Sequence, residues 1–380
     1  MNNQTKIGII GGGLAGLTAA IHLLKQGFFV ILFEKNSFPK HKVCGEFISN
    51  EVWEYLHFLN LNIESLQPTK INRTVFSTQD GKTIGSQLPL GGFGVSRYAL
   101  DNHLHKNVIA LGGVIIQTNV TDVTFSNDIF TIKTEENQDY TFKIALGAFG
   151  KRSNLDIRLG RRFIKKKSPW LAVKAHYQID FPNDLVALHN FEGGYCGISK
   201  VENDAVNVCY LVQYKSFKNY KDITVFHEQV MSKNPNLKTL FVNGKLLFEK
   251  PLTISQISFE NKPKIENHML MIGDSAGLIH PLCGNGMAMA IHSAKIASEL
   301  VILYLENVIN RKQLEIQYVS DWNKTFKNRL RFGKIVSKIV LNFYLSKIIM
   351  RNLLIFPFLF PMIIKKTHGK SINKKTNRKL

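Results

Sequence analysis

The chain has 380 residues, which is enough for two or three domains of ordinary size. Its hydrophobic content of 44%, with 11% aromatic residues, excludes a disordered or fibrous protein. The 49 Lys and Arg residues exceed the 28 Asp and Glu residues, and the formal charge of +21 predicts an anionic partner. The four cysteines lack the paired spacing of a zinc site or a dense disulfide framework, so we expect no metal and a reducing compartment.

The positive charge is concentrated towards the C-terminal end. Residues 321–380 contain 15 Lys and Arg residues and a single acid, Asp321, so this segment carries +14 of the +21. The rest of the chain is an ordinary, mildly basic body. The anionic partner is therefore predicted for the C-terminal segment and not for the whole chain.

The first 34 residues predict a dinucleotide-binding unit. An apolar run at residues 7–10 has the pattern of a buried parallel strand, a G-x-G-x-x-G turn and a helical pattern follow, and a second strand ends at Glu34. Gly11 allows the tight turn, Gly13 lets the backbone approach a pyrophosphate, and Gly16 allows close helix packing. The acid would hold the ribose 2′-hydroxyl, which favours an unphosphorylated ribose. The cofactor-binding residues expected here are Gly11, Gly13, Leu14, Ala15, Gly16, Glu34 and Lys35.

The middle of the chain has a different pattern of predicted secondary structure. Residues 69–93 and 159–263 do not alternate between strands and helices, and the segments 171–179 and 205–212 have the pattern of antiparallel strands. Turn-forming residues lie between these two segments. We therefore expect a second domain that is built on an antiparallel sheet.

A second Gly-rich loop follows a short apolar strand at residues 269–272. Asp274, at the carboxyl end of that strand, is placed to hold sugar hydroxyls. The helix that follows, to about residue 307, would offer free N–H groups and a positive dipole to the N1–C2=O locus of a reduced flavin, which is negatively charged. The residues expected to bind this cofactor are Gly273, Asp274, Gly284, Asn285, Gly286 and Met287.

These motifs resemble those of the p-hydroxybenzoate hydroxylase-like FAD-dependent oxidoreductases, which include aromatic monooxygenases, phenolic halogenases and geranylgeranyl reductases. Asp274 and the glycines around it are similar to the second FAD motif of the family. Arg97, at a predicted helix start, is similar to an arginine that contacts FAD. Cys44, Gly45 and Glu46 resemble a segment of the geranylgeranyl reductase branch that lies against the isoalloxazine. The resemblance implies FAD as cofactor, with NAD(P)H or another external reductant as electron donor.

Two departures from the family pattern bear on the reaction. Phe149 stands where the hydroxylases have an aspartate associated with flavin and NADPH engagement, which counts against direct NADPH-dependent hydroxylation. Residues 193–199 stand where the prenyl reductases have an aromatic-rich strand, and only Gly194 and Tyr195 match it. A polyprenyl substrate is therefore left open.

The resemblance implies a mixed α/β fold, α+β overall, with a Rossmann-type FAD-binding domain and an antiparallel-sheet substrate-binding domain. The FAD-binding domain is expected to be discontinuous, with residues 1–68, 94–158 and 264–320. Residues 69–93 and 159–263 are expected to form the substrate-binding domain, and residues 321–380 a helical, basic and apolar tail.

The expected function is that of an FAD-dependent oxidoreductase acting on a hydrophobic small molecule in biosynthesis. Oxygen activation (a monooxygenase) and hydride delivery to a double bond (a reductase) stay open as alternatives, while halogenation lacks a recognisable lysine motif. A hypothesis from another class is a non-catalytic flavin- or nucleotide-binding protein that its tail recruits to a membrane or to nucleic acid.

Two side chains next to the expected flavin are candidates for catalysis. The thiol of Cys44 would shape the environment of the ring or donate a proton, and the alternative is a small buried packing residue. Glu46 would act as a general acid or base, and the alternative is a surface or Arg-paired carboxylate.

The tail interleaves cations with apolar residues from residue 333 onward. Residues 353–364 are uncharged but contain two prolines, and they are too short to span a bilayer, which takes about 20 residues. The composition predicts association of residues 333–380 with an anionic membrane and not with nucleic acid. The expected location is therefore cytoplasmic, peripheral on the inner face of the membrane. The alternative is that residues 333–356 form a helix packed on the body.

Overall fold

The first sheet begins with the strand that leads into the Gly-rich turn. The computed structural model describes residues 6–220 and 222–372. Within them, six strands lie in the order β17-β18-β10-β1-β2-β6, parallel except for β17. Their bounds are β1 (Lys6–Ile10), β2 (Phe29–Phe33), β6 (Val114–Ile116), β10 (Ile144–Gly147), β17 (Ile265–Glu266) and β18 (Met269–Met271). A parallel sheet is covered on both faces, and this explains the continuous apolar runs of β1 and β2.

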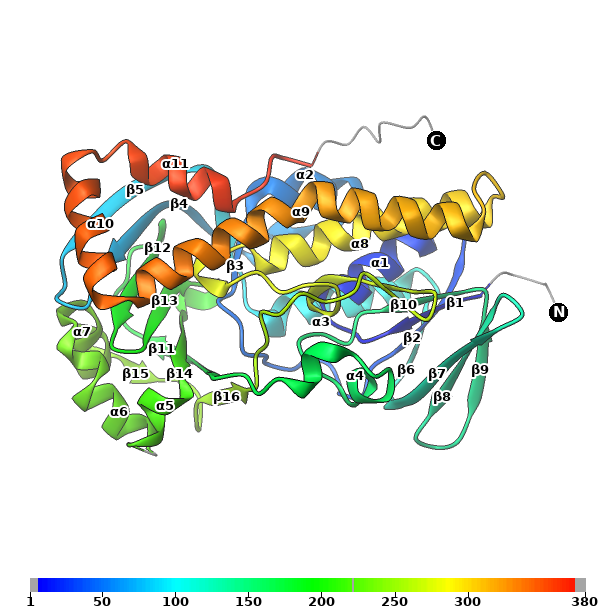
Figure 1. The fold of residues 1–380 in the computed structure, drawn as a ribbon, viewed down its shortest axis with the longest axis horizontal. Coiled ribbons are helices and arrows are strands. Elements are labelled where there is room, and N and C mark those ends of the chain that lie inside the picture. The colour runs from blue at the N-terminus through cyan, green and yellow to red at the C-terminus, as the bar shows by residue number, and fades with distance from the viewer. Residues whose placement is uncertain (1–5, 221, 373–380) are drawn as a thin grey trace.

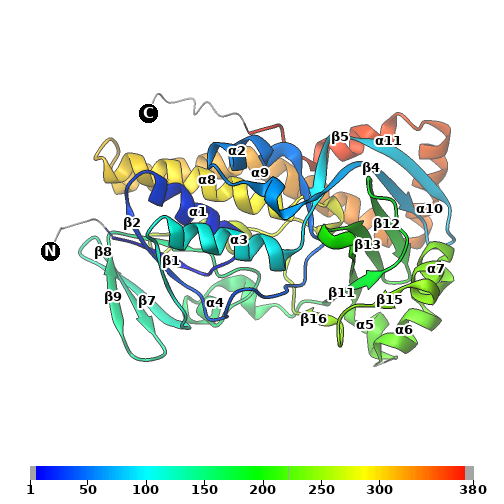
Figure 2. The same ribbon diagram turned by 180° about the vertical axis from the view of Figure 1, so that it is seen from behind.

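Helices and a small sheet provide that cover (Figures 1 and 2). The helix that follows the Gly-rich turn, α1, packs on α3 and α8, and α8 packs on α9. The small sheet, in the order β7-β8-β9, lies against Gly8, because a Cβ on that glycine would meet Ile132 and Phe142. The bounds of these elements are α1 (Leu14–Lys25), α2 (Trp53–Phe58), α3 (Arg97–Ala110), α4 (Asn154–Arg158), α8 (Gly286–Leu305), α9 (Arg311–Leu341), β7 (Val120–Ser126), β8 (Ile129–Thr134) and β9 (Asp139–Phe142).

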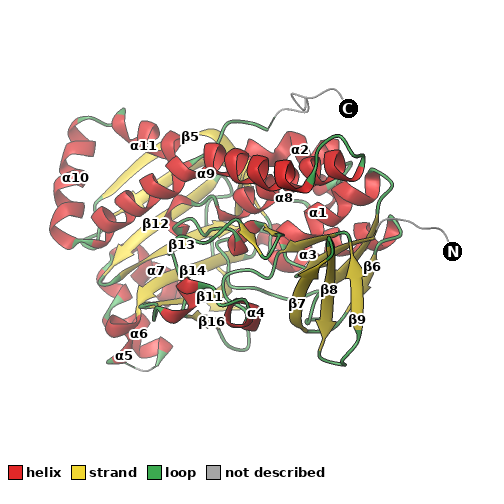
Figure 3. Ribbon diagram, turned by 45° about the vertical axis from the view of Figure 1, so that its right-hand side comes forward, coloured by secondary structure: helices red, strands yellow, loops and turns green. Residues whose placement is uncertain are grey.

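The second large sheet contains the strands expected from the middle of the chain (Figure 3). Its order is β15-β11-β14-β13-β12-β4-β5-β3, with β16 also paired to β11. The segments 171–179 and 205–212 correspond to β11 and β14, which are antiparallel neighbours as predicted. The bounds are β3 (Phe47–Ser49), β4 (Thr69–Ser77), β5 (Thr83–Gly94), β11 (Trp170–Gln178), β12 (Leu185–Phe191), β13 (Gly194–Lys200), β14 (Val206–Gln213), β15 (Lys245–Leu246) and β16 (Leu252–Ser255). Strand β3 pairs with β5, so the chain enters this sheet before residue 68, where we placed the domain boundary.

The two faces of this sheet have different neighbours. Val173 and Ala175 of β11 point into a core shared with α5 (Tyr214–Lys218), α6 (Ile223–Gln229) and α7 (Pro235–Asn243). Because side chains alternate along a strand, Ala172 and Lys174 point to the other face. That face carries a second apolar cluster, which includes Leu278 from the Gly-rich loop and Val340 from α9. The sheet thus closes over the cofactor-binding loops.

The tail is helical and packs on the body. Helix α9 ends at Leu341, and Asn342 caps the next helix, so the single helix considered for residues 333–356 is broken there. Helices α10 (Phe343–Ile355) and α11 (Leu359–Thr367) lie over β4 and β5 (Figure 1). Their buried side chains contact Phe76 and Ile84 of those strands. Residues 373–380 of the predicted membrane segment lie outside the described residues.

The end of the tail is tied to the body by a buried acid. Glu51 is fully buried and accepts a hydrogen bond from Arg329 Nη1 at 3.2 Å. Its backbone carbonyl accepts from the N–H of Ile372 at 2.8 Å. Helix α8 is long and apolar enough to cross a membrane, but 61% of that stretch is buried inside the protein, as in a core helix.

The tail helices are expected to stabilise the fold. Phe360→Ala removes a ring that is 9% exposed and packs on the large sheet, so it should lower the free energy of unfolding by about 3 kcal/mol. Met362→Ala, at a side chain 55% exposed, is the matched control and should change it little. Thermal or denaturant unfolding measures both, and equal effects of the two substitutions would contradict the packing described for α11.

Candidate active site

The Gly-rich turn presents an open backbone surface beside a helix start. Gly11 has a φ of +109°, and a Cβ there would collide with the carbonyl of Ala148. A Cβ on Gly16 would collide with the carbonyl of Gly11, so these two glycines serve the turn and the packing of α1. At Gly13 the nearest atom to an added Cβ is Arg97 Nη2, at 4.0 Å. The start of α1, including Leu14 and Ala15, has no side-chain cap, so its N–H groups are available to an anion.

Glu34 ties the end of β2 to this turn. Its carboxylate accepts three hydrogen bonds, from the N–H of Gly12 at 2.8 Å and from the N–H and the Nδ2 of Asn36 at 2.9 and 2.6 Å. A carboxylate has about four acceptor positions, so Glu34 can still receive a ribose hydroxyl. A hollow lies beside it, lined by Glu34, Asn36, Ser37, Phe38, Lys40 and Lys42. Lys35 is exposed and does not line this hollow, so its expected contact with the cofactor stays a prediction.

Two cations flank the turn. Arg97 bonds both oxygens of the buried Asp101, each at 2.7 Å, and Lys42 Nζ reaches the same carboxylate at 2.9 Å. Burial alone would raise the pKa of Asp101, but the two cations hold it below its ordinary value. Two cations share one carboxylate, so the group has a net charge of +1 beside Gly13. This charge suits an anionic pyrophosphate. Arg97 was predicted from the sequence as a cofactor contact, whereas Lys42 was not, because nothing in its local pattern distinguishes it from a surface lysine.

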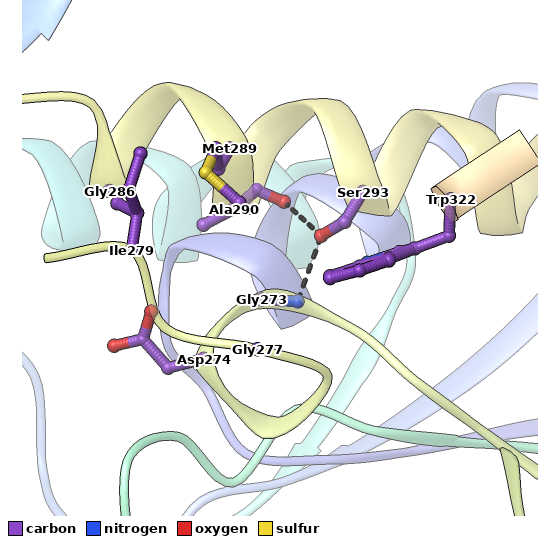
Figure 4. A pocket seen from close by; sticks show the side chains of 9 residues that line it. All are labelled: Gly273, Asp274, Gly277, Ile279, Gly286, Met289, Ala290, Ser293 and Trp322. Atoms are coloured by element: carbon purple, nitrogen blue, oxygen red, sulfur yellow. Dashed lines mark hydrogen bonds between the residues drawn. The ribbon is translucent and has the colours of Figure 1, made fainter. Parts of the chain in front are cut away.

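The second Gly-rich loop lies against the first turn of α1. Gly273 has a φ of +58°, and a Cβ there would approach Ala15 Cβ to 2.8 Å. Its N–H donates to Ser293 Oγ of α8 at 2.8 Å, and Figure 4 shows the Asp274 carboxylate directed away from this bond. A pocket at this place is lined by Gly273, Asp274, Gly277, Ile279, Gly286, Met289, Ala290, Ser293 and Trp322. The loop thus lies between the first turn of α1 and the N-terminal half of α8.

Three buried basic side chains donate hydrogen bonds to the backbone carbonyls of this loop. Lys262 Nζ donates to the carbonyl of Asp274, Arg161 Nη2 to that of Ser275, and Lys264 Nζ to that of Ala276, each at 2.8 Å. Burial lowers the pKa of Lys262 to about 8 and that of Lys264 to about 7. Neither the sequence pattern nor the family resemblance indicated these three residues.

A residue at the start of α8 forms a hydrogen bond to the tail. Gly284 has a φ of +62° and Met287 is buried. The buried Asn285 does not cap the helix with its side chain, which instead donates to the carbonyl of Thr367 at 3.2 Å. A contact of Asn285 with a cofactor would therefore involve its backbone, whereas Gly286 lines the pocket.

Glu46 is fully buried and receives three hydrogen bonds. Lys174 Nζ donates at 2.5 Å, His176 Nε2 at 2.7 Å and the backbone N–H of Arg97 at 2.7 Å. Burial would raise the pKa of Glu46, but the bond from His176 and the charge of Lys174 outweigh it and hold the pKa below its ordinary value. His41 also lies near, and the three groups His41, Glu46 and His176 come within 4.8 Å, but Lys174 already supplies the positive charge there.

Cys44 lies beside the same face of the sheet. Its carbonyl accepts from Asn207 Nδ2 of β14 at 3.2 Å, and its side chain is half-buried. The guanidinium of Arg97 interacts with its thiol. The structure therefore brings Cys44, Glu46 and Arg97 together, and their expected contacts with the flavin stay a prediction.

An apolar cluster with unpartnered polar atoms fills the space between the sheet and the loop that follows Asp274. It contains Ala172, Tyr195, Leu211, Ile257, Leu278 and Leu282. Among the described residues, Tyr195 Oη and both ring nitrogens of His280 have no hydrogen-bond partner. Burial lowers the pKa of His280 to about 4, so its ring is neutral at pH 7. Buried polar atoms are normally satisfied, so these atoms can bond to a water or to a polar group of a bound molecule.

The residues present fit FAD. The open face of Gly13, the uncapped starts of α1 and α8, and the excess charge of Arg97 and Lys42 suit a pyrophosphate and a flavin that carries negative charge. The carboxylates of Glu34 and Asp274 suit sugar hydroxyls.

The comparisons with known sequences agree with this site. Residues 9–57 match the family described as NAD(P)-binding Rossmann-like domain. The chain is 25% identical over 369 residues to Conditioned medium factor receptor 1 of Dictyostelium discoideum, covering 89% of this chain and 71% of that protein. It is 20% identical to a menaquinone reductase of Mycobacterium tuberculosis (79% and 77% covered). It is 21% identical to a digeranylgeranylglycerophospholipid reductase of Methanoculleus marisnigri (85% and 82% covered).

Solved structures of flavin enzymes share the fold. The flavin-dependent brominase Bmp2 superposes with a TM-score of 0.79 at 18% identity, over 97% of this chain and 94% of that one. The flavin-dependent halogenase CmlS gives a TM-score of 0.75 at 19% identity over 88% of this chain, which spans only 64% of the halogenase. The mixed α/β fold with a Rossmann-type cofactor domain is thus confirmed.

Removing the loop carboxylate should weaken cofactor binding. Asp274→Ala deletes a charged acceptor for sugar hydroxyls, and one charged hydrogen bond contributes about 1.5–3 kcal/mol, so the affinity for FAD should fall roughly ten- to a hundredfold. Titration of the apoprotein with FAD, followed by flavin fluorescence, measures it. Asp139→Ala, at an exposed acid on β9, is the control. Unchanged affinity in Asp274→Ala would remove the role assigned to this carboxylate.

The buried Lys264 should make stability depend on pH. Its pKa is about 7 in the folded chain against an ordinary value of 10.5, so between these values the unfolded chain binds more protons. The free energy of unfolding should therefore rise as the pH increases from 7 towards 10, by up to about 1.4 kcal/mol per pH unit from this group. Lys264→Met should remove that part of the slope, while Lys238→Met, at an exposed lysine, should keep it. Parallel slopes for wild type and Lys264→Met would contradict the assignment.

Proposed function

We propose that this chain, one of the FAD-dependent oxidoreductases of the p-hydroxybenzoate hydroxylase-like superfamily, reduces a carbon–carbon double bond in a hydrophobic, isoprenoid-like molecule. The observation that carries the proposal is the apolar cluster between the large sheet and the loop after Asp274, with Cys44 beside it. The choice of a reductase over a monooxygenase is our inference from the side chains gathered there.

The apolar cluster suits a long hydrocarbon substrate. Val43, directly before Cys44, packs on it, whereas the Cys44 side chain packs on the core of the part that contains α1 and β1. Leu188 and Val340 belong both to this cluster and to the one beneath α10 and α11. The apolar surface is therefore continuous from the Cys44 segment to the tail helices. Such a lining selects against charged substrates because burying a charge without a partner is costly.

Residues of the loops and helix starts around the Gly-rich turn would hold the reactants. The turn at Gly13, Glu34, Arg97 and Asp274 would bind FAD, which, once reduced by an external nicotinamide, supplies the hydride that one carbon of the double bond receives. The other carbon needs a proton, and we assign its donation to the Cys44 thiol. Arg97 beside this thiol would stabilise the thiolate that remains, and the half-buried position allows water to return the proton.

Glu46 has a different role in this proposal from the one considered from the sequence. An ionised carboxylate with three donors has no proton to give, so Glu46 is a positioning residue. It fixes the backbone after Cys44 against β11. The names of two relatives, a menaquinone reductase and a digeranylgeranylglycerophospholipid reductase, support a reductase of lipid-like molecules.

The reaction is tested by supplying isoprenoid alcohols or quinones with reduced FAD in the absence of oxygen. A product with two added hydrogens would support the proposal. A product that contains one oxygen atom and forms only with oxygen present would identify a monooxygenase instead. A purified protein that is colourless and does not take up FAD would favour a non-catalytic protein and reject the proposal.

The assignment of the proton donor predicts a selective loss. Cys44→Ala should lower kcat about a hundredfold or more, since general acid catalysis contributes about 10²–10⁴-fold, while flavin absorbance is retained. Cys209→Ala, on β14 opposite Lys174, is the matched control on the same sheet face and should keep most of the activity. Equal activity of both variants would show that another group donates the proton.

A further inference from the structure

The last two helices of the tail pack on the body through one side only. Helices α10 and α11 contact the large sheet through Met350, Leu353, Phe360 and Ile364. Their opposite side forms the left and upper left edge of the molecule in Figure 1. Eight large apolar side chains there are between 45% and 76% exposed: Tyr344, Leu345, Ile348, Leu354, Ile355, Phe356, Phe358 and Met362. We call this surface the tail face.

The exposed apolar residues of the tail face are grouped and not scattered. Tyr344, Ile348 and Ile355 follow one another at helical spacing on the side of α10 opposite Met350. Phe356 and Phe358 continue the surface through the turn into α11. Single exposed apolar side chains are ordinary on a soluble protein, whereas a contiguous group of this kind marks a binding surface.

The charge on the tail face indicates the partner. Residues 342–372 contain no acid and five cations, of which Lys347 pairs with Asp80 of the body at 3.5 Å: Lys347, Arg351, Lys365, Lys366 and Lys370. Arg351 lies on the same exposed side of α10 as Ile348 and Ile355, and no described residue forms an ion pair with it. Apolar side chains with cations among them suit the boundary of an anionic bilayer, where the chains enter the headgroup region and the cations reach phosphates.

We propose that the tail face docks this protein on the surface of an anionic lipid bilayer. Helix α10 has 13 residues and α11 has 9, so neither is long enough to span a bilayer, which takes about 20. The helices therefore lie in the interface while their other side stays packed on the sheet. Nucleic acid offers a polar, charged backbone and would leave the exposed leucines, isoleucines and phenylalanines of this surface in water, so it fits this surface less well.

Docking in this way brings the bilayer close to the proposed substrate site. Leu188 and Val340 lie in the cluster beneath the tail helices and also in the cluster beside Cys44. A hydrocarbon substrate would then pass from the bilayer to the site along apolar side chains. This consequence rests on the proposed function, whereas the docking itself does not.

The test uses the full chain, because deleting the tail would uncover the large sheet. Vesicles of phosphatidylcholine alone and of phosphatidylcholine with phosphatidylglycerol are sedimented with the protein. Wild type should bind the anionic vesicles, and binding should weaken as salt is raised. Ile348→Gln with Ile355→Gln, and separately Arg351→Glu with Lys365→Glu, should each weaken binding at least about tenfold. Ile316→Gln with Lys312→Glu, at exposed positions near the opposite end of α9, is the matched control and should bind as wild type does.

Flavin absorbance and the melting temperature of each variant show that the fold is kept. Wild type that fails to sediment with anionic vesicles, equal binding to neutral vesicles, or full binding by the tail-face variants would overturn the proposal. A dimer that the same substitutions dissociate, without vesicle binding, would assign the tail face to a second copy of the chain and overturn it too. Loss of reductase activity with vesicle binding intact would count against the proposed function alone.

Discussion

The buried carboxylate of Glu46 joins three parts of the molecule that are distant in sequence. Its donors are the first backbone N–H of α3, at Arg97, and two side chains of β11, Lys174 and His176. Removing one partner of a buried ion pair typically costs about 3–5 kcal/mol, because the remaining charge has no water to solvate it. Separating the cofactor-binding side from the large sheet at this point would therefore cost several kcal/mol of folding free energy. The positions of Arg97 and of Cys44 both follow from this connection.

A second buried arrangement fixes the loop on the other side of the site. Lys262, Arg161 and Lys264 each donate to one of three successive carbonyls, so the loop backbone is held without any contribution from Asp274's own carboxylate. That carboxylate is left for a ligand. The protein thus uses buried basic side chains as donors to the loop backbone, and the hydrogen bonds that they make to these three carbonyls leave the Asp274 carboxylate at the pocket.

The sequence was sufficient for features that depend on local geometry. Gly11 and Gly16 were assigned correctly because a turn this tight admits no Cβ, and Arg97 was placed by its helix start. The partners of Glu46 could not be predicted, since Lys174 lies in β11 and its sequence pattern matches that of an ordinary half-exposed strand. Burial of a charge arises from tertiary contacts between segments more than a hundred residues apart, and no local periodicity records it.

The tail also shows that sequence patterns do not reveal tertiary contacts. Its alternation of cations and apolar residues was clear, but a helix with apolar residues on both sides does not reveal which side packs. Only the contacts of Met350 and Phe360 with the sheet show that α10 and α11 are part of the fold as well as its surface. The break at Asn342 was also invisible, because asparagine is common within polar stretches and caps α10 only in this setting.

The hydrogen bond between Asn285 and the carbonyl of Thr367 couples the start of α8 to the end of α11. It connects the residue directly before α8 to the last residue of α11, and Glu51 joins the same group through Arg329. Any ligand that orders the start of α8 therefore also orders the end of α11. By reciprocity, anything that immobilises the tail tightens that ligand by the same free energy. Two segments that lie 82 residues apart in the chain thus share a single conformational equilibrium.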